Sequence, residues 1–337
     1  MMGNSTMQAL VYEGPKIMNM RELQVPQLLE DEVLIKVEVA GICGSELSGY
    51  LGHNSLRKPP LVMGHEFAGS IEKLGVGVKR IALGDRVTVN PLITCRVCRY
   101  CLSGESQLCP NRQLLGAHRP GAFAEYIAVP ERNVYKLPEN LSYEQGAFVE
   151  PFACAVHLCR IALLTPRDRL VIYGAGPIGL FVLQTAHVYG VRNVVVVDLN
   201  ESRLEIAAEL GATVVTNIEK AVGSSLGSFD VAIDAVGAGV TRQLCIKAVR
   251  PGGIVIFTGL HEAEATLPIN DMIRSEIVTK GAFAYSTEDF ETALEWIGQE
   301  RVNLLPWTEQ YPIAEGGACF DKLISGPGKV AKILLKP

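Results

Sequence analysis

The first 135 or so residues follow the pattern of short, partly buried strands. Runs rich in β-branched residues are separated by Gly and Pro punctuation such as Gly14-Pro15 and Pro120-Gly121. The predicted strands are Ala9–Tyr12, Glu32–Val39, Phe67–Leu74, Arg86–Val89 and Ala124–Val129. We therefore expect a small antiparallel barrel or sandwich, preceded by a frayed extension of the first six residues.

From about Tyr143 the pattern changes to strands that alternate with helices. A helix is predicted over Ala147–Leu164, and after Pro166 the order becomes strand, glycine loop, helix, strand. This order and its continuation are formed by Leu170–Tyr173, Gly174–Gly179, Leu180–Tyr189, Asn193–Val197, Arg203–Leu210, Thr213–Val215, Val231–Asp234, Val240–Val249 and Ile254–Thr258. Such alternation is typical of α/β proteins with a doubly wound parallel sheet that helices cover on both faces.

Beyond about Gly281 the sequence leaves this rhythm. Thr287–Gln299 is predicted to be an amphipathic helix, Ala314–Ser325 another, and Lys329–Leu335 a last strand. We expect this tail to return to the first domain. The predicted organisation is a β-rich domain over residues 1–150, an α/β domain over 151–281 and a returning segment over 282–337.

Length and charge narrow the class of protein. A chain of 337 residues, 48% hydrophobic and 20% charged, has enough apolar residues for two globular domains and is not disordered or fibrous. The net charge is −5 and no basic tract is present, so nucleic acid is not an expected partner. No apolar run reaches the roughly 18 residues of a membrane span. The first ten residues do not resemble a signal peptide, so a cytoplasmic location is expected.

The glycine loop Gly174-Ala175-Gly176-Pro177-Ile178-Gly179 lies between a predicted strand and a predicted helix. In this setting the glycines permit a tight turn, close approach of a pyrophosphate and tight helix–strand packing, and the helix start offers N–H groups to phosphate. Asp198 ends the next strand, nineteen residues after Gly179. An acid there accepts hydrogen bonds from the ribose hydroxyls and repels a 2′-phosphate, which favours NAD over NADP. A glycine turn without a ligand is the alternative interpretation.

Arg203, five residues after Asp198, either flanks the ribose or is a solvated helix residue. The complete predicted cofactor site consists of Gly174, Gly176, Pro177, Ile178, Gly179, Asp198, Arg203, Val236 and Thr258.

Four of the nine cysteines are clustered as C-x2-C-x2-C-x7-C, at Cys95, Cys98, Cys101 and Cys109. In a chain without a secretory signal, such spacing favours metal ligands over disulfides. Four thiolates at these spacings can converge on one tetrahedral zinc ion, which would hold a loop in place and leave no open position. An iron–sulfur cluster and two disulfides are the alternatives.

Three separated segments hold further candidate ligands: Gly41–Glu46, Gly64-His65-Glu66 and Val149-Glu150-Pro151. Each is ambiguous alone, because a single cysteine is usually part of a core. Their order ahead of a nucleotide fold, together with Gly121–Tyr126 (GAFAEY), resembles the zinc-containing medium-chain alcohol dehydrogenases. The resemblance covers nearly the whole chain. It is strongest with the polyol branch, which includes sorbitol, galactitol-phosphate, butanediol and threonine dehydrogenases.

The resemblance implies a GroES-like catalytic domain with a structural-zinc lobe at about residues 91–112, and a Rossmann NAD-binding domain. It implies that Cys43 and His65 bind a catalytic zinc, with Glu66 as a further ligand and Glu150 bound directly or through water. Glu46 stands where the family usually has Asp, as the partner that orients the histidine. Its additional methylene leaves that geometry open.

The implied function is hydride transfer between a polyol or secondary alcohol and NAD through a zinc-bound alkoxide. Ser45 would take the alcohol proton. Ser48 stands where many relatives have the histidine that ends this relay, so water or the ribose hydroxyls are the alternative outlets. The same resemblance implies a homodimer or homotetramer. A zinc-independent quinone or enone reductase of the same fold and a non-catalytic NAD-binding regulator are the competing hypotheses.

Overall fold

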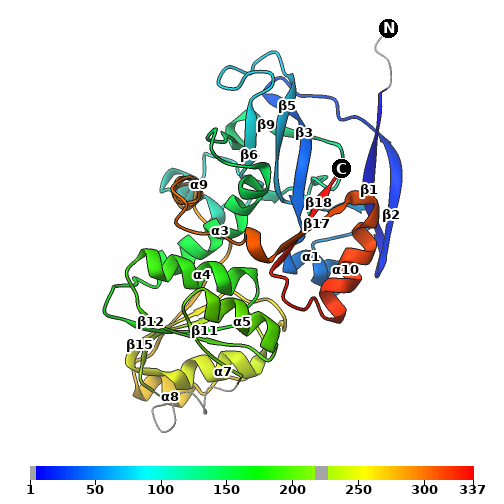
Figure 1. The fold of residues 1–337 in the computed structure, drawn as a ribbon. Helices are drawn as coiled ribbons and strands as arrows, with labels where there is room; N and C mark the ends of the chain where they lie inside the picture. Colours follow the sequence, from blue (N-terminus) through cyan, green and yellow to red (C-terminus); the bar gives the residue numbers. More distant parts are fainter. Residues whose placement is uncertain (1–4, 217–226) are drawn as a thin grey trace. The chain divides into compact units, whose positions relative to one another are not determined.

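The computed structural model describes residues 5–216 and 227–337, which form two compact units (Figure 1). The first unit consists of Met1–Glu150 and Ser286–Pro337, and the second of Pro151–Tyr285. The chain passes from one unit to the other within helix α3 (Tyr143–Ile161). Within the described residues, no helix has the length and apolar character needed to cross a bilayer.

The first unit is built on two β-sheets. The larger has the order β10-β6-β5-β3-β18-β17, with β9 also paired to β3, and the smaller has the order β2-β1-β4. Their strands are β1 (Thr6–Gly14), β2 (Ile17–Gln24), β3 (Glu32–Gly41), β4 (Leu61–Val62), β5 (Glu66–Leu74), β6 (Arg86–Val89), β9 (Tyr126–Pro130), β10 (Val134–Lys136), β17 (Thr308–Pro312) and β18 (Lys332–Lys336). β18 pairs antiparallel with β3, with Leu334 opposite Gly41. The C-terminal segment therefore adds strands β18 and β17 to the larger sheet beside β3.

Short elements surround these sheets. They are the helices α1 (Gly44–Tyr50), α2 (Arg99–Leu102), α9 (Thr287–Gly298) and α10 (Gly316–Ser325), the 3-10 turns η1 (Ser106–Leu108), η2 (Glu131–Asn133), η3 (Leu305–Trp307) and η4 (Ile313–Glu315), and the hairpin of β7 (Leu92–Ile93) with β8 (Gln113–Leu114). The core between them is apolar and holds the buried rings of Phe67, Phe123 and Phe320. The ring of Phe320 on α10 contacts that of Phe123 edge to face, with centroids 6.1 Å apart, so the returning segment contributes to this core.

The second unit has one sheet of six parallel strands in the order β13-β12-β11-β14-β15-β16. The strands are β11 (Arg169–Tyr173), β12 (Asn193–Val197), β13 (Thr213–Val215), β14 (Phe229–Asp234), β15 (Val249–Phe257) and β16 (Val278–Gly281). Among the helices, α4 (Pro177–Val188) and α5 (Glu201–Glu209) lie on one side of the sheet, and α7 (Gly239–Ala248) and α8 (Ile269–Arg274) on the other (Figure 1). The predicted doubly wound parallel sheet is confirmed. Its strand order reverses at β11 and β14, and such a switch point leaves a crevice at the carboxyl ends of the strands.

The structure differs from the sequence-based expectations mainly at elements that bury little apolar surface. Strand β2 pairs with β1 along its length, although none of its residues is fully buried. Because Thr6 pairs with Gln24, the frayed extension expected over the first six residues is wrong at Thr6. The expectation for residues 1–4 lies outside the described residues. Helices α1 and α8 and strands β16 and β17 are also elements that the hydrophobic pattern did not predict.

Candidate active site and metal centres

Cys43, His65 and Glu66 come together because strands β3 and β5 are neighbours. Gly41, at the end of β3, lies directly opposite Glu66, the first residue of β5. Cys43 follows two residues after Gly41, and His65 immediately precedes β5. One donor atom from each of Cys43, His65 and Glu66 lies within 4.8 Å of the other two. Two segments separated by about twenty residues in sequence thus form one cluster of sulfur, nitrogen and oxygen donors.

Glu46 orients the imidazole of His65. Its Oε1 accepts hydrogen bonds from His65 Nδ1 at 2.9 Å and from the Gly64 backbone N–H at 2.7 Å, and its Oε2 accepts one from Cys43 N–H at 3.0 Å. Burial alone would raise the pKa of Glu46, but the charge and hydrogen bond of His65, the charge of Arg57 and the Cys43 N–H together lower that pKa. The longer glutamate side chain therefore reaches the histidine, and Nε2 is left to face a metal ion.

Gly64 is required for this arrangement. Its φ of 101° lies in the left-handed region, and a Cβ at this position would lie 2.7 Å from the backbone nitrogen of Phe123. The segment Gly121–Tyr126, which the sequence resemblance singled out, is thus the backbone against which Gly64 packs.

A buried lysine faces the third donor. Lys332 Nζ forms an ion pair with Glu66 Oε2, and the side chains are 3% and 1% exposed respectively. Burial would lower the pKa of Lys332, but the negative charges of Glu66 and Cys43 raise it above its ordinary value. Lys332 is the first residue of β18, so the returning C-terminal strand brings a cation to the donor cluster.

The donors at this site fit zinc. Zinc binds thiolate, imidazole and carboxylate together, and catalytic sites use three protein ligands with one position left open. Glu150 lies buried on α3, but the cluster of mutually close donor atoms found among the described residues contains only Cys43, His65 and Glu66. Glu66 is therefore the carboxylate for which the geometry gives direct support.

Ser45 lies on α1, next to the cluster. Its hydroxyl donates to Cys43 Sγ at 3.4 Å and accepts a hydrogen bond from Arg57 Nη2 at 3.0 Å. Ser45 is partly exposed, whereas Arg57 is 4% exposed. A serine hydroxyl is thus held between a sulfur donor of the cluster and a buried guanidinium group.

The four clustered cysteines form a second group of donors. Their sulfur atoms lie within 4.8 Å of one another, with separations of 3.5 Å (Cys95–Cys109), 3.6 Å (Cys98–Cys101) and 4.0 Å (Cys95–Cys101). A tetrahedron with metal–sulfur bonds of about 2.3 Å has sulfur–sulfur edges of about 3.8 Å. All four thiols are free, which argues against the two disulfides. Backbone N–H groups of Val97 and Cys98 lower the pKa of Cys95 to about 6, and this favours the thiolate that zinc binds.

The glycine loop occupies the carboxyl edge of the parallel sheet. Gly174 directly follows β11, has a φ of 105° and donates to the Val197 carbonyl at the end of β12. A Cβ on Gly179 would overlap the carbonyl oxygen of Gly174, whereas one on Gly176 would meet open space. The third glycine therefore serves packing, and the second leaves room for a ligand near the start of α4.

Other predicted cofactor residues lie along the same edge. Asp198 follows β12, and its Oδ2 accepts the Ala175 N–H at 2.7 Å, which ties the acid to the glycine loop. The Nε of Arg203, on α5, is buried and has no hydrogen-bond partner among the residues that the structure describes. Val236 and Thr258 follow β14 and β15, and the N–H groups of both bond to Asp234. A buried guanidinium nitrogen without a partner favours the interpretation that Arg203 has a ligand over that of a solvated residue.

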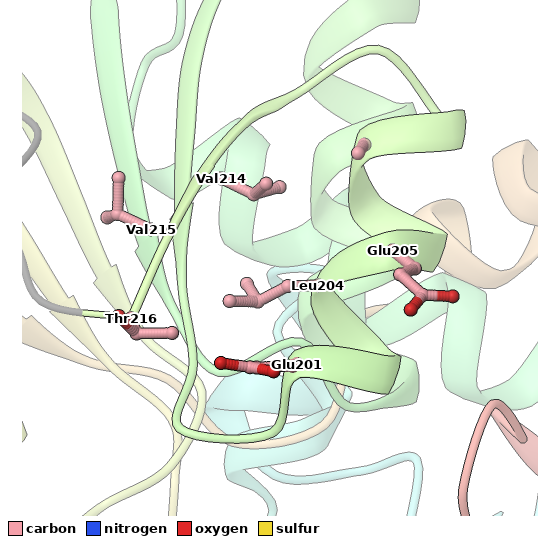
Figure 2. A pocket seen from close by; sticks show the side chains of 7 residues that line it. Glu201, Leu204, Glu205, Val214, Val215 and Thr216 are labelled. Atoms are coloured by element: carbon pink, nitrogen blue, oxygen red, sulfur yellow. The ribbon is translucent and has the colours of Figure 1, made fainter.

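A separate hollow of about 450 Å³ lies beside α5, between that helix and β13 (Figure 2). It is lined by Glu201, Leu204, Glu205, Ala208, Val214, Val215 and Thr216. None of the predicted site residues lines it. Two of its side chains are carboxylates, which do not favour a phosphate ligand, so we assign it no function.

Residues 29–139 match the family described as alcohol dehydrogenase GroES-like domain, and residues 177–299 match zinc-binding dehydrogenase. A probable D-xylulose reductase A of Aspergillus terreus is 35% identical over 314 residues, which are 88% of each chain. The L-threonine 3-dehydrogenase of Legionella pneumophila (strain Philadelphia 1) is 35% identical over 325 residues, 92% of this chain and 95% of the relative. The chain belongs to the zinc-binding alcohol dehydrogenase family.

Solved structures of zinc-binding alcohol dehydrogenases and their relatives have the same fold over the whole chain. The 2R,3R-butanediol dehydrogenase of Bacillus subtilis superposes with a TM-score of 0.89 at 30% identity, covering 98% of this chain and 99% of that one. The rspB alcohol dehydrogenase of Escherichia coli CFT073, solved with NADH, gives a TM-score of 0.92 at 28% identity over 99% and 100% of the two chains. The predicted family is thereby confirmed.

Within this member of the zinc-binding alcohol dehydrogenase family, sequence reasoning missed two buried cations at the donor cluster. A signal for Lys332 was present, because a lysine directly before an apolar run of buried residues needs a partner if it is buried with them. Arg57 gave no such signal, since it lies in a loop of ordinary polar composition. Tyr50, at the end of α1, lies in the core against Phe320, and its hydroxyl donates to Asp321 Oδ1 at 2.9 Å.

Proposed function

We propose that this protein is a zinc-dependent oxidoreductase that transfers a hydride between a polyol or other secondary alcohol and NAD. The observation that carries the proposal is the cluster of Cys43, His65 and Glu66 donors in a chain of the zinc-binding alcohol dehydrogenase family. Relatives named as xylulose reductase, threonine dehydrogenase and butanediol dehydrogenase support an alcohol or polyol as the substrate.

In this proposal Cys43, His65 and Glu66 hold a catalytic zinc, with Glu150 as a direct or water-mediated ligand, and the four-cysteine lobe holds a structural zinc. A bound catalytic zinc supplies Lewis acidity that lowers the pKa of an alcohol hydroxyl. Glu46 keeps His65 in the tautomer and orientation that a metal requires. Ser45 Oγ, next to Cys43, accepts the proton that leaves the substrate hydroxyl.

The nucleotide site uses the second unit. The loop of Gly174, Gly176 and Gly179 and the N–H groups at the start of α4, from Ile178 onward after Pro177, receive the pyrophosphate of NAD, which supplies the hydride acceptor. Asp198 accepts the ribose hydroxyls, and Arg203, Val236 and Thr258 line the same edge. A homodimer or homotetramer and a cytoplasmic location remain predictions from the sequence.

The test is a metal assay together with a substrate panel. We expect two zinc ions per chain, and NADH formation with at least one member of a panel of sugar alcohols, their phosphates, diols, hydroxy acids and amino alcohols. A protein without zinc that reduced quinones would favour the zinc-independent reductase. A fully zinc-loaded protein that binds NAD but oxidises no panel member would favour the non-catalytic regulator.

Asp198→Ala is expected to reduce the preference for NAD over NADP by about 10- to 100-fold, which corresponds to about 1.4–2.8 kcal/mol. The carboxylate discriminates because it accepts ribose hydroxyls and repels a 2′-phosphate. Since Asp198 also accepts the Ala175 N–H, affinity for both cofactors falls, and the ratio of the two kcat/KM values is the quantity to measure. Glu201→Ala, an exposed acid nearby on α5, is the matched control and keeps the ratio. Full discrimination in Asp198→Ala would refute the ribose assignment.

A further inference from the structure

Arg57 is a buried cation whose charge acts on the nearby buried carboxylate of Glu46 and helps to lower the pKa of that carboxylate. It lies in the loop after α1, is 4% exposed, and forms no ion pair with any acid in the part of the chain that the structure describes. Its Nη2 donates to Ser45 Oγ at 3.0 Å, while its Nε has no hydrogen-bond partner. Burying an arginine costs folding free energy unless opposite charges or hydrogen-bond acceptors compensate its positive charge. The one side-chain acceptor it has is the hydroxyl next to the metal donors.

The surrounding backbone is shaped to hold this arginine. A Cβ on Gly49 of α1 would lie 2.5 Å from Arg57 Cδ, so the glycine leaves the space that the side chain fills. The loop is fixed from both ends: the Arg57 N–H donates to the Asn54 carbonyl at 3.2 Å, and Asn54 Nδ2 donates to the Ser45 carbonyl at 3.4 Å. Main-chain and side-chain hydrogen bonds therefore hold Arg57 next to Ser45.

We propose that Arg57 is a positioning residue that acts through Ser45, and the proposal rests on the proposed dehydrogenase function. A guanidinium group only donates hydrogen bonds and keeps its protons in proteins. Its bond to Ser45 Oγ therefore has a fixed direction: Oγ is the acceptor, the hydroxyl hydrogen points to Cys43 Sγ, and one lone pair remains for the substrate hydroxyl.

The proton balance follows from this geometry. Ser45 turns its own hydrogen away from Cys43 Sγ and releases it to water as Oγ takes the proton of the substrate hydroxyl, and Arg57 accepts neither proton. The buried positive charge of Arg57 stabilises the negative charge that develops on Ser45 Oγ during the transfer. Arg57 therefore assists the transfer as a fixed charge and is not itself a proton carrier.

A double-mutant cycle tests this role in the zinc-loaded enzyme. Arg57→Met and Ser45→Ala are each expected to lower kcat about 100-fold, in the range of a lost acid–base group. If Arg57 acts through Ser45, the double variant is expected to lose little more than the worse single variant. Independent effects that multiply to about 10⁴-fold would overturn the proposal. Lys58→Met, which removes an adjacent exposed cation, is the matched control and keeps the wild-type rate.

Two further readouts separate positioning from simple structural support. In Arg57→Met, kcat is expected to fall while zinc content and KM stay close to wild type, because the lost charge acts only during proton transfer. A rise in KM, or a loss of zinc that accounts for the loss of rate, overturns the proposal. If Arg57→Met does not fold, Arg57→Lys takes its place in the cycle. It must then lower kcat when Ser45 is present and leave kcat unchanged in the Ser45→Ala background.

The cycle is also run on unfolding of the zinc-free protein in urea. The Arg57–Ser45 hydrogen bond predicts that the two substitutions shift the midpoint non-additively, whether or not a substrate has been found. Additive midpoints would overturn the contact itself. If the midpoints are non-additive but the protein oxidises no alcohol, the Arg57–Ser45 contact is supported and the proposed function is wrong.

Discussion

Replacing Cys43 with alanine is expected to abolish alcohol oxidation while NAD binding persists. The thiol supplies the only sulfur donor of the cluster with His65 and Glu66, and an imidazole with one carboxylate holds zinc far more weakly than the full set. We expect kcat to fall by at least about 10⁴-fold, which corresponds to about 5.4 kcal/mol at 1.36 kcal/mol per factor of ten. Cofactor binding is preserved because the glycine loop belongs to the other compact unit.

The measurements are zinc content, NADH binding by fluorescence and turnover with the best substrate of the panel. One zinc per chain is expected to remain, held by the four-cysteine lobe. Cys319→Ala is the matched control, because Cys319 is a buried cysteine of the same unit that belongs to neither donor group. It is expected to lose some stability but no zinc. If Cys43→Ala kept two zinc ions and its activity, the assignment of the catalytic metal would be wrong.

The parts of the fold that the sequence predicted are those in which periodicity and burial agree. The parallel strands β11, β12 and β14 are short apolar runs with buried residues on both faces, so their pattern identifies them without tertiary information. Strand β2 fails this test, because its side chains are exposed or partly exposed and only its backbone pairing with β1 defines it. Helix α1 is short and contains two glycines, so its stability comes from contacts with the site and not from helix propensity.

The candidate site was predictable where a motif encodes local geometry. The cysteine spacing and the glycine loop each lie within a few residues of one another, so spacing alone constrains their shape. The prediction of the metal cluster depended on the order of the motifs along the chain and on the family resemblance. The pairing of β3 with β5, which brings Cys43 close to His65, cannot be read from a single sequence. Arg57 and Lys332 could not be assigned in this way, since each acquires its role from a partner that only the folded chain brings near.

Lys332→Met is expected to destabilise the zinc-free protein by about 3–5 kcal/mol, because it leaves the carboxylate of Glu66 buried without a partner. A bound zinc ion replaces the lost positive charge, so the zinc-loaded variant is expected to lose much less stability. The same reasoning predicts that the variant binds zinc more tightly, since Lys332 no longer competes for Glu66. The ion pair in the native protein thus keeps Glu66 folded inward before metal arrives, at some cost in zinc affinity.

Urea unfolding with chelator and with saturating zinc measures this difference, and competition with a chromogenic chelator measures affinity. Lys336→Met is the matched control. It is on the same strand but 49% exposed, and its pair with Glu144 at 3.1 Å is expected to contribute no more than about 1 kcal/mol in either metal state. Glu66→Gln combined with Lys332→Met removes both charges and should recover most of the lost zinc-free stability. Equal destabilisation by Lys332→Met with and without zinc would show that Lys332 supports the strand through packing alone and does not act as the counter-charge of a metal ligand.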